Sequence, residues 1–146
     1  MKTITPEKII EIICEYYNLT ELQLMQETRK IKIVKPRQIL HYLIRKYIKT
    51  RIKGSERYKR ISLKDTGKVT NQDHATVLNS IKSVDSYIAT NQSVRLEIKY
   101  LEGLVKSNVN VKEYVKYLYN EKKKINKLIM EAESNNSEVI YKLITA

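Results

Sequence analysis

Apolar residues recur every three or four positions along most of this chain, which is the spacing of one face of an α-helix. The pattern is clear in the third predicted helix, where Ile39, Leu40, Leu43 and Ile44 share one face. We therefore predict an all-α fold with several helices. The helices expected in the first part of the chain cover residues 6–18, 20–26, 35–49, 62–67, 71–88 and 93–107.

Signals for helix starts support these boundaries. Thr5 precedes Pro6, and a Thr cap followed by Pro at the first helical position is typical of a helix N-terminus. Thr20 begins a sequence with the spacing of a capping box. The stretch 26–34 lacks a helical period, so we predict a basic loop there, with the third helix beginning near Lys35.

The stretch 62–81 predicts a short helix, a tight turn and a second helix. Ser62 can cap the first helix, and Gly67 stands where a chain leaving a helix often takes a positive φ. Asn71 can cap the second helix, with Asp73 in its first turn, where a negative charge suits the helix dipole. The apolar positions expected to face the core are Val77, Leu78, Ile81 and Val84.

The N-terminal end of this second helix stays polar. Its polar side chains are Gln72, Asp73, His74, Thr76 and Asn79. In a helix-turn-helix protein this end of the second helix contacts base edges in the major groove. We therefore predict that it reads double-stranded DNA.

The last part of the chain is expected to form a helical extension over residues 109–146, after a DNA-binding domain over residues 5–108. A charged helix with an apolar stripe is predicted over 111–133, a break at 134–136 and a short helix over 139–144. Helices of this kind cannot bury much apolar surface alone. They either pack back on the domain or join copies of the chain into a homo-oligomer.

The positive charge is concentrated in one window. The chain has a net charge of +12, and residues 29–60 hold thirteen Lys and Arg against the single acid Glu56. This window carries the whole excess, because the remaining basic and acidic residues cancel. A charge run can be a solvated face, but a local cationic surface just before a helix-turn-helix favours a polyanion such as DNA.

Several classes of site and location are not expected. The single Cys14 excludes a disulfide framework, and with only two His a structural zinc site is implausible. No apolar run reaches membrane-spanning length and the N-terminus lacks a signal peptide, so we expect a cytoplasmic protein without a membrane partner. Adjacent helical residues point about 100° apart, so Asp73 and His74 do not face each other as an acid–base pair. We expect no enzymatic activity and no cofactor.

Three segments carry a family resemblance: residues 36–43 (Pro-Arg-Gln-Ile-Leu-His-Tyr-Leu), residues 62–67 and residues 73–78 (Asp-His-Ala-Thr-Val-Leu). Together with Ile12 to Tyr17, they resemble the C-terminal DNA-binding domain of DnaA, the bacterial replication initiator. The resemblance spans about residues 9–105. It implies a helix-turn-helix of the DnaA C-terminal, Trp-repressor-like type.

The resemblance also implies roles for individual residues. In that family the helix containing Asp-His enters the major groove, which here implies Asp73, His74, Thr76 and Asn79. An Arg of the basic loop enters the adjacent minor groove, which implies Arg29, with Lys30 and Lys32 in the same loop. The phosphate contacts that it implies are Lys35, Arg37, Gln38, Arg45 and the backbone around Ser62 and Leu63.

The chain departs from the family pattern at four places, and at one of them Thr70-Asn71 replaces a Gly-rich turn. Gln72 stands where the family usually has Arg, and Ala75 where it usually has Ser or Thr. The helical pattern breaks around Gly54-Ser55, so we expect residues 50–60 to form a strongly basic linker or helix extension. This basic segment, from Lys49 to Arg60, is longer than the family's short loop. Phosphate contacts from this segment could offset lost base contacts, although they carry no sequence information. The target sequence therefore stays open.

These observations predict sequence-specific binding of double-stranded DNA in replication or transcriptional control, in a bacterial or phage-infected cell. One alternative is a structural or packaging protein that binds nucleic acid without sequence preference and assembles through its C-terminal helices. Another is a protein-interaction module in which the helix-turn-helix is only a scaffold.

Overall fold

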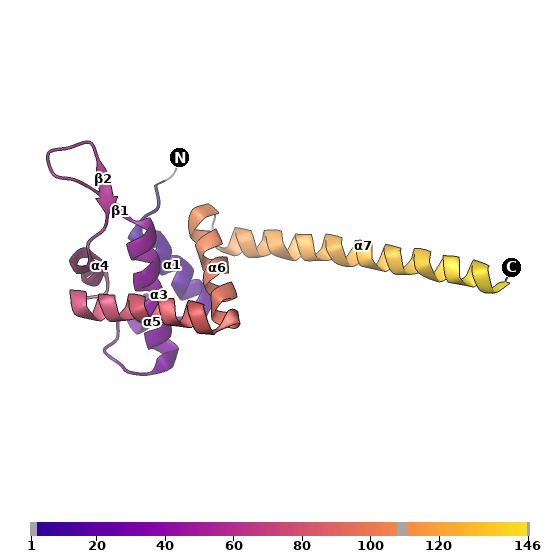
Figure 1. Cartoon of the computed structure of the whole chain (residues 1–146), viewed down its shortest axis with the longest axis horizontal. Helices are drawn as coiled ribbons and strands as arrows, with labels where there is room; N and C mark the ends of the chain where they lie inside the picture. The colour runs from indigo at the N-terminus through magenta and orange to yellow at the C-terminus, as the bar shows by residue number, and fades with distance from the viewer. Residues whose placement is uncertain (1–2, 108–110, 146) are drawn as a thin grey trace. The chain divides into compact units, whose positions relative to one another are not determined.

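The computed structural model of the chain describes residues 3–107 and 111–145 and divides into two compact units, Met1–Asn108 and Val109–Ala146. The described residues form helices and one two-stranded sheet, so the predicted all-α class is confirmed. The first unit contains α1 (Pro6–Tyr17), α2 (Glu21–Leu24), α3 (Ile31–Tyr47), β1 (Lys49–Arg51), β2 (Tyr58–Arg60), α4 (Leu63–Val69), α5 (His74–Thr90) and α6 (Gln92–Ser107) (Figure 1). The second unit contains α7 (Val111–Thr145).

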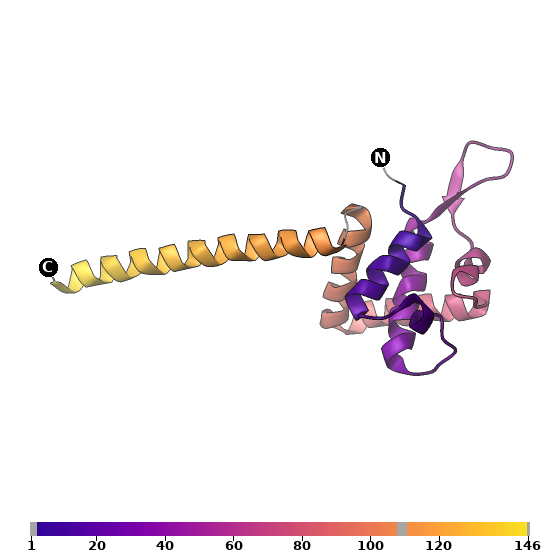
Figure 2. The ribbon, with the colours of Figure 1, turned by 180° about the vertical axis from the view of Figure 1, so that it is seen from behind.

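Helix α3 forms the centre of the first unit and packs against α1, α2, α4 and α5. From one side α5 crosses in front of α3 (Figure 1), and from behind α1 lies in front of it (Figure 2). The apolar face of α3 is buried, as its spacing predicts. The fully buried apolar side chains of this core include Ile9, Ile12, Ile13, Leu24, Ile39, Leu40, Leu43, Ile44, Val77, Leu101 and Leu104.

The predicted caps at the start of the chain are confirmed. Thr5 caps α1, its side-chain oxygen accepting a hydrogen bond from the Lys8 amide at 3.3 Å. Thr20 and Gln23 form a capping box at α2. Ser62 caps α4, because its Oγ accepts from the Asp65 amide at 3.0 Å.

The predicted start of α3 was wrong, because the helix begins at Ile31 rather than near Lys35. Pro36 therefore lies inside the helix, where its missing N–H removes one helical hydrogen bond. Burial of Ile33 in the core explains why the helix extends past this local signal. Arg29 and Lys30 remain in the loop, whereas Lys32 belongs to the first turn of α3.

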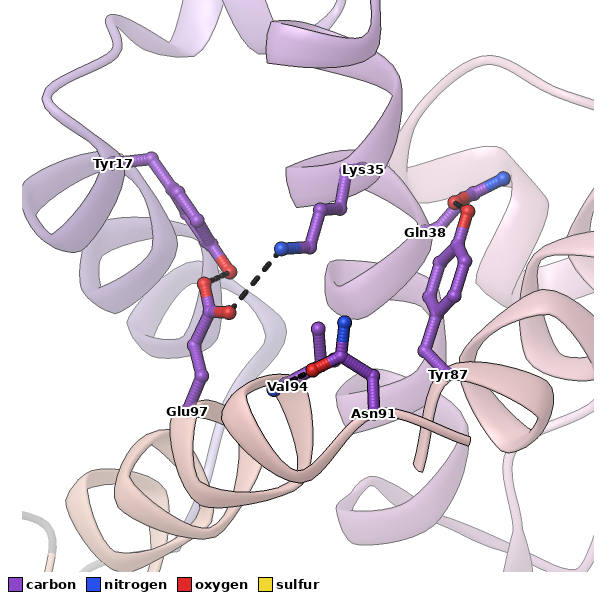
Figure 3. A network of polar contacts seen from close by, with 7 residues as sticks. All are labelled: Tyr17, Lys35, Gln38, Tyr87, Asn91, Val94 and Glu97. Carbon is purple, nitrogen blue, oxygen red and sulfur yellow. Dashed lines mark hydrogen bonds and ion pairs between the residues drawn. The ribbon is translucent and has the colours of Figure 1, made fainter. Parts of the chain in front are cut away.

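A polar network ties α1, α3 and α6 together (Figure 3). The Tyr17 hydroxyl donates to Glu97 Oε1 at 2.5 Å, and Lys35 Nζ lies 3.3 Å from Glu97 Oε2. Burial, followed by the bond to Glu97, raises the pKa of Tyr17, so its hydroxyl keeps the proton that it donates. Beside this network the Tyr87 hydroxyl donates to Gln38 Oε1 at 3.4 Å, which links α5 to α3.

A fully buried histidine, His41, forms hydrogen bonds that link α3 to the helix-turn-helix. Nδ1 of His41 lies 2.8 Å from Ser80 Oγ on α5, and Nε2 lies 2.6 Å from Thr70 Oγ1 in the turn. Ser80 Oγ also donates to the carbonyl of Thr76 at 3.0 Å, so it accepts from a protonated Nδ1, and Thr70 donates to Nε2. Burial and the neighbouring Arg37 charge lower the pKa of His41 to about 4. The neutral imidazole therefore holds α3, the turn and α5 together.

The turn between α4 and α5 differs from the predicted one. Gly67 does not take a positive φ; it lies inside α4, and Asn71 is the left-handed residue, with φ 54°. Asp73 rather than Asn71 caps α5, its Oδ1 accepting from the Thr76 amide at 2.8 Å. Glycine is needed at 67 for close approach, because a Cβ there would lie 2.2 Å from the carbonyl oxygen of Gln72.

The buried face of α5 was only partly predicted. Val77 and Val84 are buried, but Leu78 is exposed and Ile81 is half-buried. The buried Ser80 takes part of their place, because its hydroxyl is satisfied by His41 and by a backbone carbonyl. Helical periodicity alone predicts that a polar residue such as Ser80 is exposed, because the pattern does not reveal its buried hydrogen-bond partner.

The basic segment after α3 is a β-hairpin, and not the linker or helix extension that the sequence predicted. Its strands pair antiparallel, with Lys49 opposite Arg60 and Arg51 opposite Tyr58. Gly54 takes φ 76° in the connection, a conformation that favours glycine. We call residues 49–60 the basic hairpin.

The second unit is a single continuous helix of 35 residues, α7. The break predicted at 134–136 and the separate short helix after it were wrong, because backbone hydrogen bonding continues through these polar residues. The side chains of Val111, Tyr114 and the residues from 137 onward lie outside the described residues.

Within the described ranges, none of the helices combines the length and the hydropathy that a membrane span requires. The same residues contain no group of three or more His, Cys, Asp or Glu that could hold a metal ion.

The buried neutral His41 predicts a pH-dependent stability. The unfolded state gains a proton near the ordinary pKa of 6.5, whereas the folded state resists protonation down to about 4, so stability is full above pH 6.5 and falls as the pH drops towards 4. Over this window we expect the wild type to lose on the order of 3 kcal/mol more unfolding free energy than His41→Leu. Urea denaturation at a series of pH values measures it. The control His74→Asn keeps the wild-type slope; parallel profiles for wild type and His41→Leu would contradict the assignment.

The close approach at Gly67 predicts a position-dependent effect of Gly→Ala. Gly67→Ala places a methyl group against the Gln72 backbone, so we expect a loss of roughly 1–3 kcal/mol of unfolding free energy. Gly103→Ala on α6 is the matched control, because its Cβ meets nothing within 4 Å. The control should gain roughly 0.5–1 kcal/mol from helix propensity. Denaturant unfolding measures both, and a neutral Gly67→Ala would contradict the turn geometry.

Candidate nucleic-acid interface

The N-terminal end of α5 presents a polar surface. His74 and Asn79 are exposed, and Thr76 and Gln72 are half-buried. The backbone amide of Gln72 donates to the carbonyl of Gly67 at 2.8 Å, which fixes the backbone entering α5. The backbone that carries these side chains is therefore fixed at the turn, where Gln72 Oε1 lies 3.5 Å from Thr70 Oγ1.

Besides the buried Arg37, four of the predicted site residues line one surface hollow. A hollow of about 150 Å³ lies between α3 and the start of α5. The predicted site residues that line it, in addition to Arg37, are Gln38, Gln72, Thr76 and Asn79. Two amides and a hydroxyl from the α5 end thus share one surface with an amide from α3. Such groups can donate to and accept from base edges.

Asp73 and His74 have different positions from these four. The Asp73 carboxylate caps α5, and its hydrogen bonds from Thr76, with a smaller contribution from His74, lower the pKa of the carboxyl. Asp73 is therefore an exposed, ionised cap. His74 is the first residue of α5 and lies at the exposed tip of the helix.

The basic residues of the window 29–60 separate into exposed and internally bound groups. Among the residues that the structure describes, nine of the thirteen are exposed and form no ion pair with an acidic residue. They form two clusters: the loop cluster of Arg29, Lys30 and Lys32, and the hairpin cluster of Lys49, Arg51, Lys53, Arg57, Lys59 and Arg60. The other four, Lys35, Arg37, Arg45 and Lys46, bind other parts of the fold.

Arg37, a predicted phosphate contact, lies inside the fold. Its side chain is buried, with 6% exposed, and its guanidinium donates to the carbonyl oxygens of Leu24, at 2.8 Å from Nε, and Gln26. Burial lowers the pKa of Arg37, yet an arginine stays charged at neutral pH. Arg37 therefore holds the end of α2 and the start of the basic loop against α3, and so positions the loop cluster.

Lys35 and Arg45 also make internal contacts that the sequence did not predict. Lys35 pairs with Glu97, so its charge is partly compensated. Arg45 donates to the carbonyl of Ile61, which ties the end of the basic hairpin to α3. Arg45 further lines a second hollow of about 230 Å³ with Arg60 and Asp85. Burial and the nearby Arg60 charge lower the pKa of Arg45.

The two clusters and the helix-turn-helix lie toward the same side of the first unit. In both views the basic hairpin, α4 and the loop before α3 lie on one side of α3, and α6 lies on the other (Figures 1 and 2). Ser62 and Leu63 begin α4 on this side, with the Ser62 oxygen engaged as the cap. In this projection the segments that carry the exposed cations lie on the same side of α3 as the start of α5.

Two features of this surface were absent from the sequence prediction. The hairpin had only Gly54 as a local signal, and its short strands lack an alternating apolar pattern. The His41 link joins residues 29 and 39 positions apart, which no local pattern shows. His41 and Ser80 were detectable as polar residues on otherwise apolar helix faces, whereas Thr70 lies in the turn.

Comparisons with known proteins agree on one family. Residues 6–84 match the family described as the bacterial dnaA protein helix-turn-helix. The chain is 32% identical over 106 residues to the chromosomal replication initiator protein DnaA of Spiroplasma citri and 34% identical over 101 residues to that of Bdellovibrio bacteriovorus. These matches cover 73% and 68% of this chain, but only 20% and 19% of the relatives.

A solved structure shares the fold. A crystal structure of a DNA replication initiation factor superposes with a TM-score of 0.56 at 21% sequence identity. The superposition covers 72% of this chain and 29% of the other. In the sequence comparisons, the chain spans about a fifth of the length of the curated relatives that it matches.

Proposed function

Because this chain belongs to the bacterial DnaA helix-turn-helix family, we propose that it binds double-stranded DNA and reads base sequence with the first turns of α5. The observation that carries this proposal is the polar end of α5, together with nine exposed cations in the segments before the helix-turn-helix. A helix-turn-helix places this end of its second helix in the major groove. We infer a role in replication initiation, its regulation or transcriptional control.

The side chains at the α5 end suit direct readout. Gln72 and Asn79 carry amides, which pair with the N6 and N7 edge of adenine, and Thr76 carries a hydroxyl, which can pair with several bases. His74 at the helix tip contacts a base or a phosphate. Asp73 contributes by capping α5, and its carboxylate can also accept from a cytosine amino group.

The two cationic clusters supply the contacts that hold the duplex. Arg29 enters the minor groove beside the major-groove site, and Lys30, Lys32 and the basic hairpin contact phosphates. The backbone at Ser62 and Leu63 contributes at the start of α4. Gln38 adds a contact from α3, and Lys35 a weaker one because Glu97 compensates its charge. Arg37 and Arg45 contribute to DNA binding indirectly, because they hold the loop cluster and the hairpin in place.

The second candidate function is a structural or packaging protein that binds nucleic acid without sequence preference and assembles through α7. The hairpin cluster favours it, because phosphate contacts carry no sequence information. Specific and non-specific affinity measured across salt concentrations separates the two. Specific readers prefer their site by ~10³-fold or more, whereas a non-specific binder gives only the salt slope.

His74→Ala is predicted to relax sequence preference. The residue lies exposed at the tip of α5, so its loss should remove about 1–3 kcal/mol of discrimination at one base pair. Selection of bound sequences from a random duplex pool measures the change. The control Lys82→Ala, also exposed on α5 but farther along the helix, should leave the selected motif intact. An unaltered motif for His74→Ala would contradict base readout by this residue.

Lys53→Glu with Arg57→Glu is predicted to weaken binding to all DNA sequences alike, because the basic hairpin contacts phosphates. The loss of two phosphate contacts should reduce the slope of log affinity against log salt by about two. Fluorescence anisotropy on specific and random duplexes measures both effects. Lys99→Glu with Lys106→Glu on α6 is the matched charge reversal and should cost far less. A loss confined to one sequence would contradict the proposed role of the hairpin.

A further inference from the structure

Helix α7 carries a row of mostly apolar residues at heptad spacing along one face. Because the helix runs unbroken through residues 134–136, apolar residues three and four positions apart stay on one face. The seam positions with described side chains are Val115, Leu118, Lys122, Ile125, Ile129, Ala132 and Asn136. In sequence the same spacing continues through Val139 and Leu143.

The apolar members of this seam are exposed. The exposed fraction is 50% for Val115, 36% for Leu118, 55% for Ile125 and 49% for Ile129. A helix with such a face gains most of its stability by packing against another element. The heptad spacing selects another helix as the partner, because seam residues then insert between residues of the facing helix.

The charge along α7 is polarised in a way that suits a second copy in the opposite direction. Residues 111–127 hold six Lys and two Glu, a net +4, and residues 128–145 hold three Glu and one Lys, a net −2. Parallel pairing would place the two positive halves together and Lys122 opposite its own copy. Antiparallel pairing places each positive half against the negative half of the other chain.

We propose that two copies of this chain associate through α7 as an antiparallel coiled coil. The register that keeps the isoleucines together sets Ile125 opposite Ile129 of the second copy. Lys122 then faces the small Ala132 of the other chain, which leaves room for its stem and directs its ammonium to the flanking Glu131 and Glu133. Leu118 faces Asn136. Each interface residue meets its partner twice, as two-fold symmetry requires.

This pairing extends the proposed function without depending on it. A dimer carries two DNA-binding units on one assembly, and such bivalent binding raises the overall affinity for DNA with two sites. The association itself involves no DNA, so its test stands apart from the DNA-binding tests above.

The mass of the full chain in solution tests the association. Light scattering after size-exclusion chromatography should give a dimer for the wild type and a monomer for Ile129→Asp. Met130→Asp is the matched control, because Met130 is exposed and adjacent but lies off the seam. It should remain a dimer. Circular dichroism checks that the first unit stays helical in both variants. A monomeric wild type, as expected if α7 packs within its own chain, would overturn the proposal.

Single cysteines test the direction of pairing. In a Cys14→Ser background, chains with Leu118→Cys and chains with Asn136→Cys should form a mixed disulfide when combined under oxidising conditions. Each variant alone should form little disulfide-linked dimer. Disulfides that form readily within each variant alone would show parallel pairing and overturn the antiparallel assignment.

Discussion

The neutral imidazole of His41 fixes the position of the helix-turn-helix. It is fully buried between Thr70 in the turn and Ser80 on α5, with one ring nitrogen donating and the other accepting. Buried apolar side chains pack α5 against α3, and the hydrogen bonds of His41 add the directionality that apolar contacts lack. The two bonds favour the observed arrangement over a shifted one. The orientation of the α5 end, and with it the surface that would meet DNA, depends on this constraint.

The fold divides the positive charge of the chain between two tasks. Arg37 and Arg45 bind backbone carbonyls and hold the basic loop and the basic hairpin, while Lys35 and Lys46 pair with Glu97 and Glu102 on α6. The remaining cations of the window stay exposed in two clusters. The arginines that bind backbone carbonyls thus hold the segments that carry the exposed cations. Substituting Arg37 would disturb the loop that carries Arg29 even though Arg37 itself is buried.

The sequence predicted what depends on local signals and helical periodicity. Caps such as Thr5, Thr20 and Ser62, the apolar face of α3 and the family were all predicted correctly. Contacts distant in sequence were not, since no periodicity reveals that His41 would meet Ser80 or that Arg37 would turn inward to Leu24. The turn illustrates the difference: Gly67 was recognised as special, but its reason is the approach of Gln72 rather than its own φ. Roles of individual side chains at the interface remain predictions.

In the proposed complex, the polar end of α5 contacts base edges while the exposed cations bind the phosphates of the duplex. The most direct measurement is selection of sequences bound by the unmodified full chain from a random duplex pool, followed by affinity measurement on the enriched and on a scrambled duplex at the same salt concentration. If α5 reads base sequence, we expect one enriched sequence that binds ~10³-fold or more tightly than the scrambled duplex. No enrichment, with equal affinity for both duplexes, would contradict it.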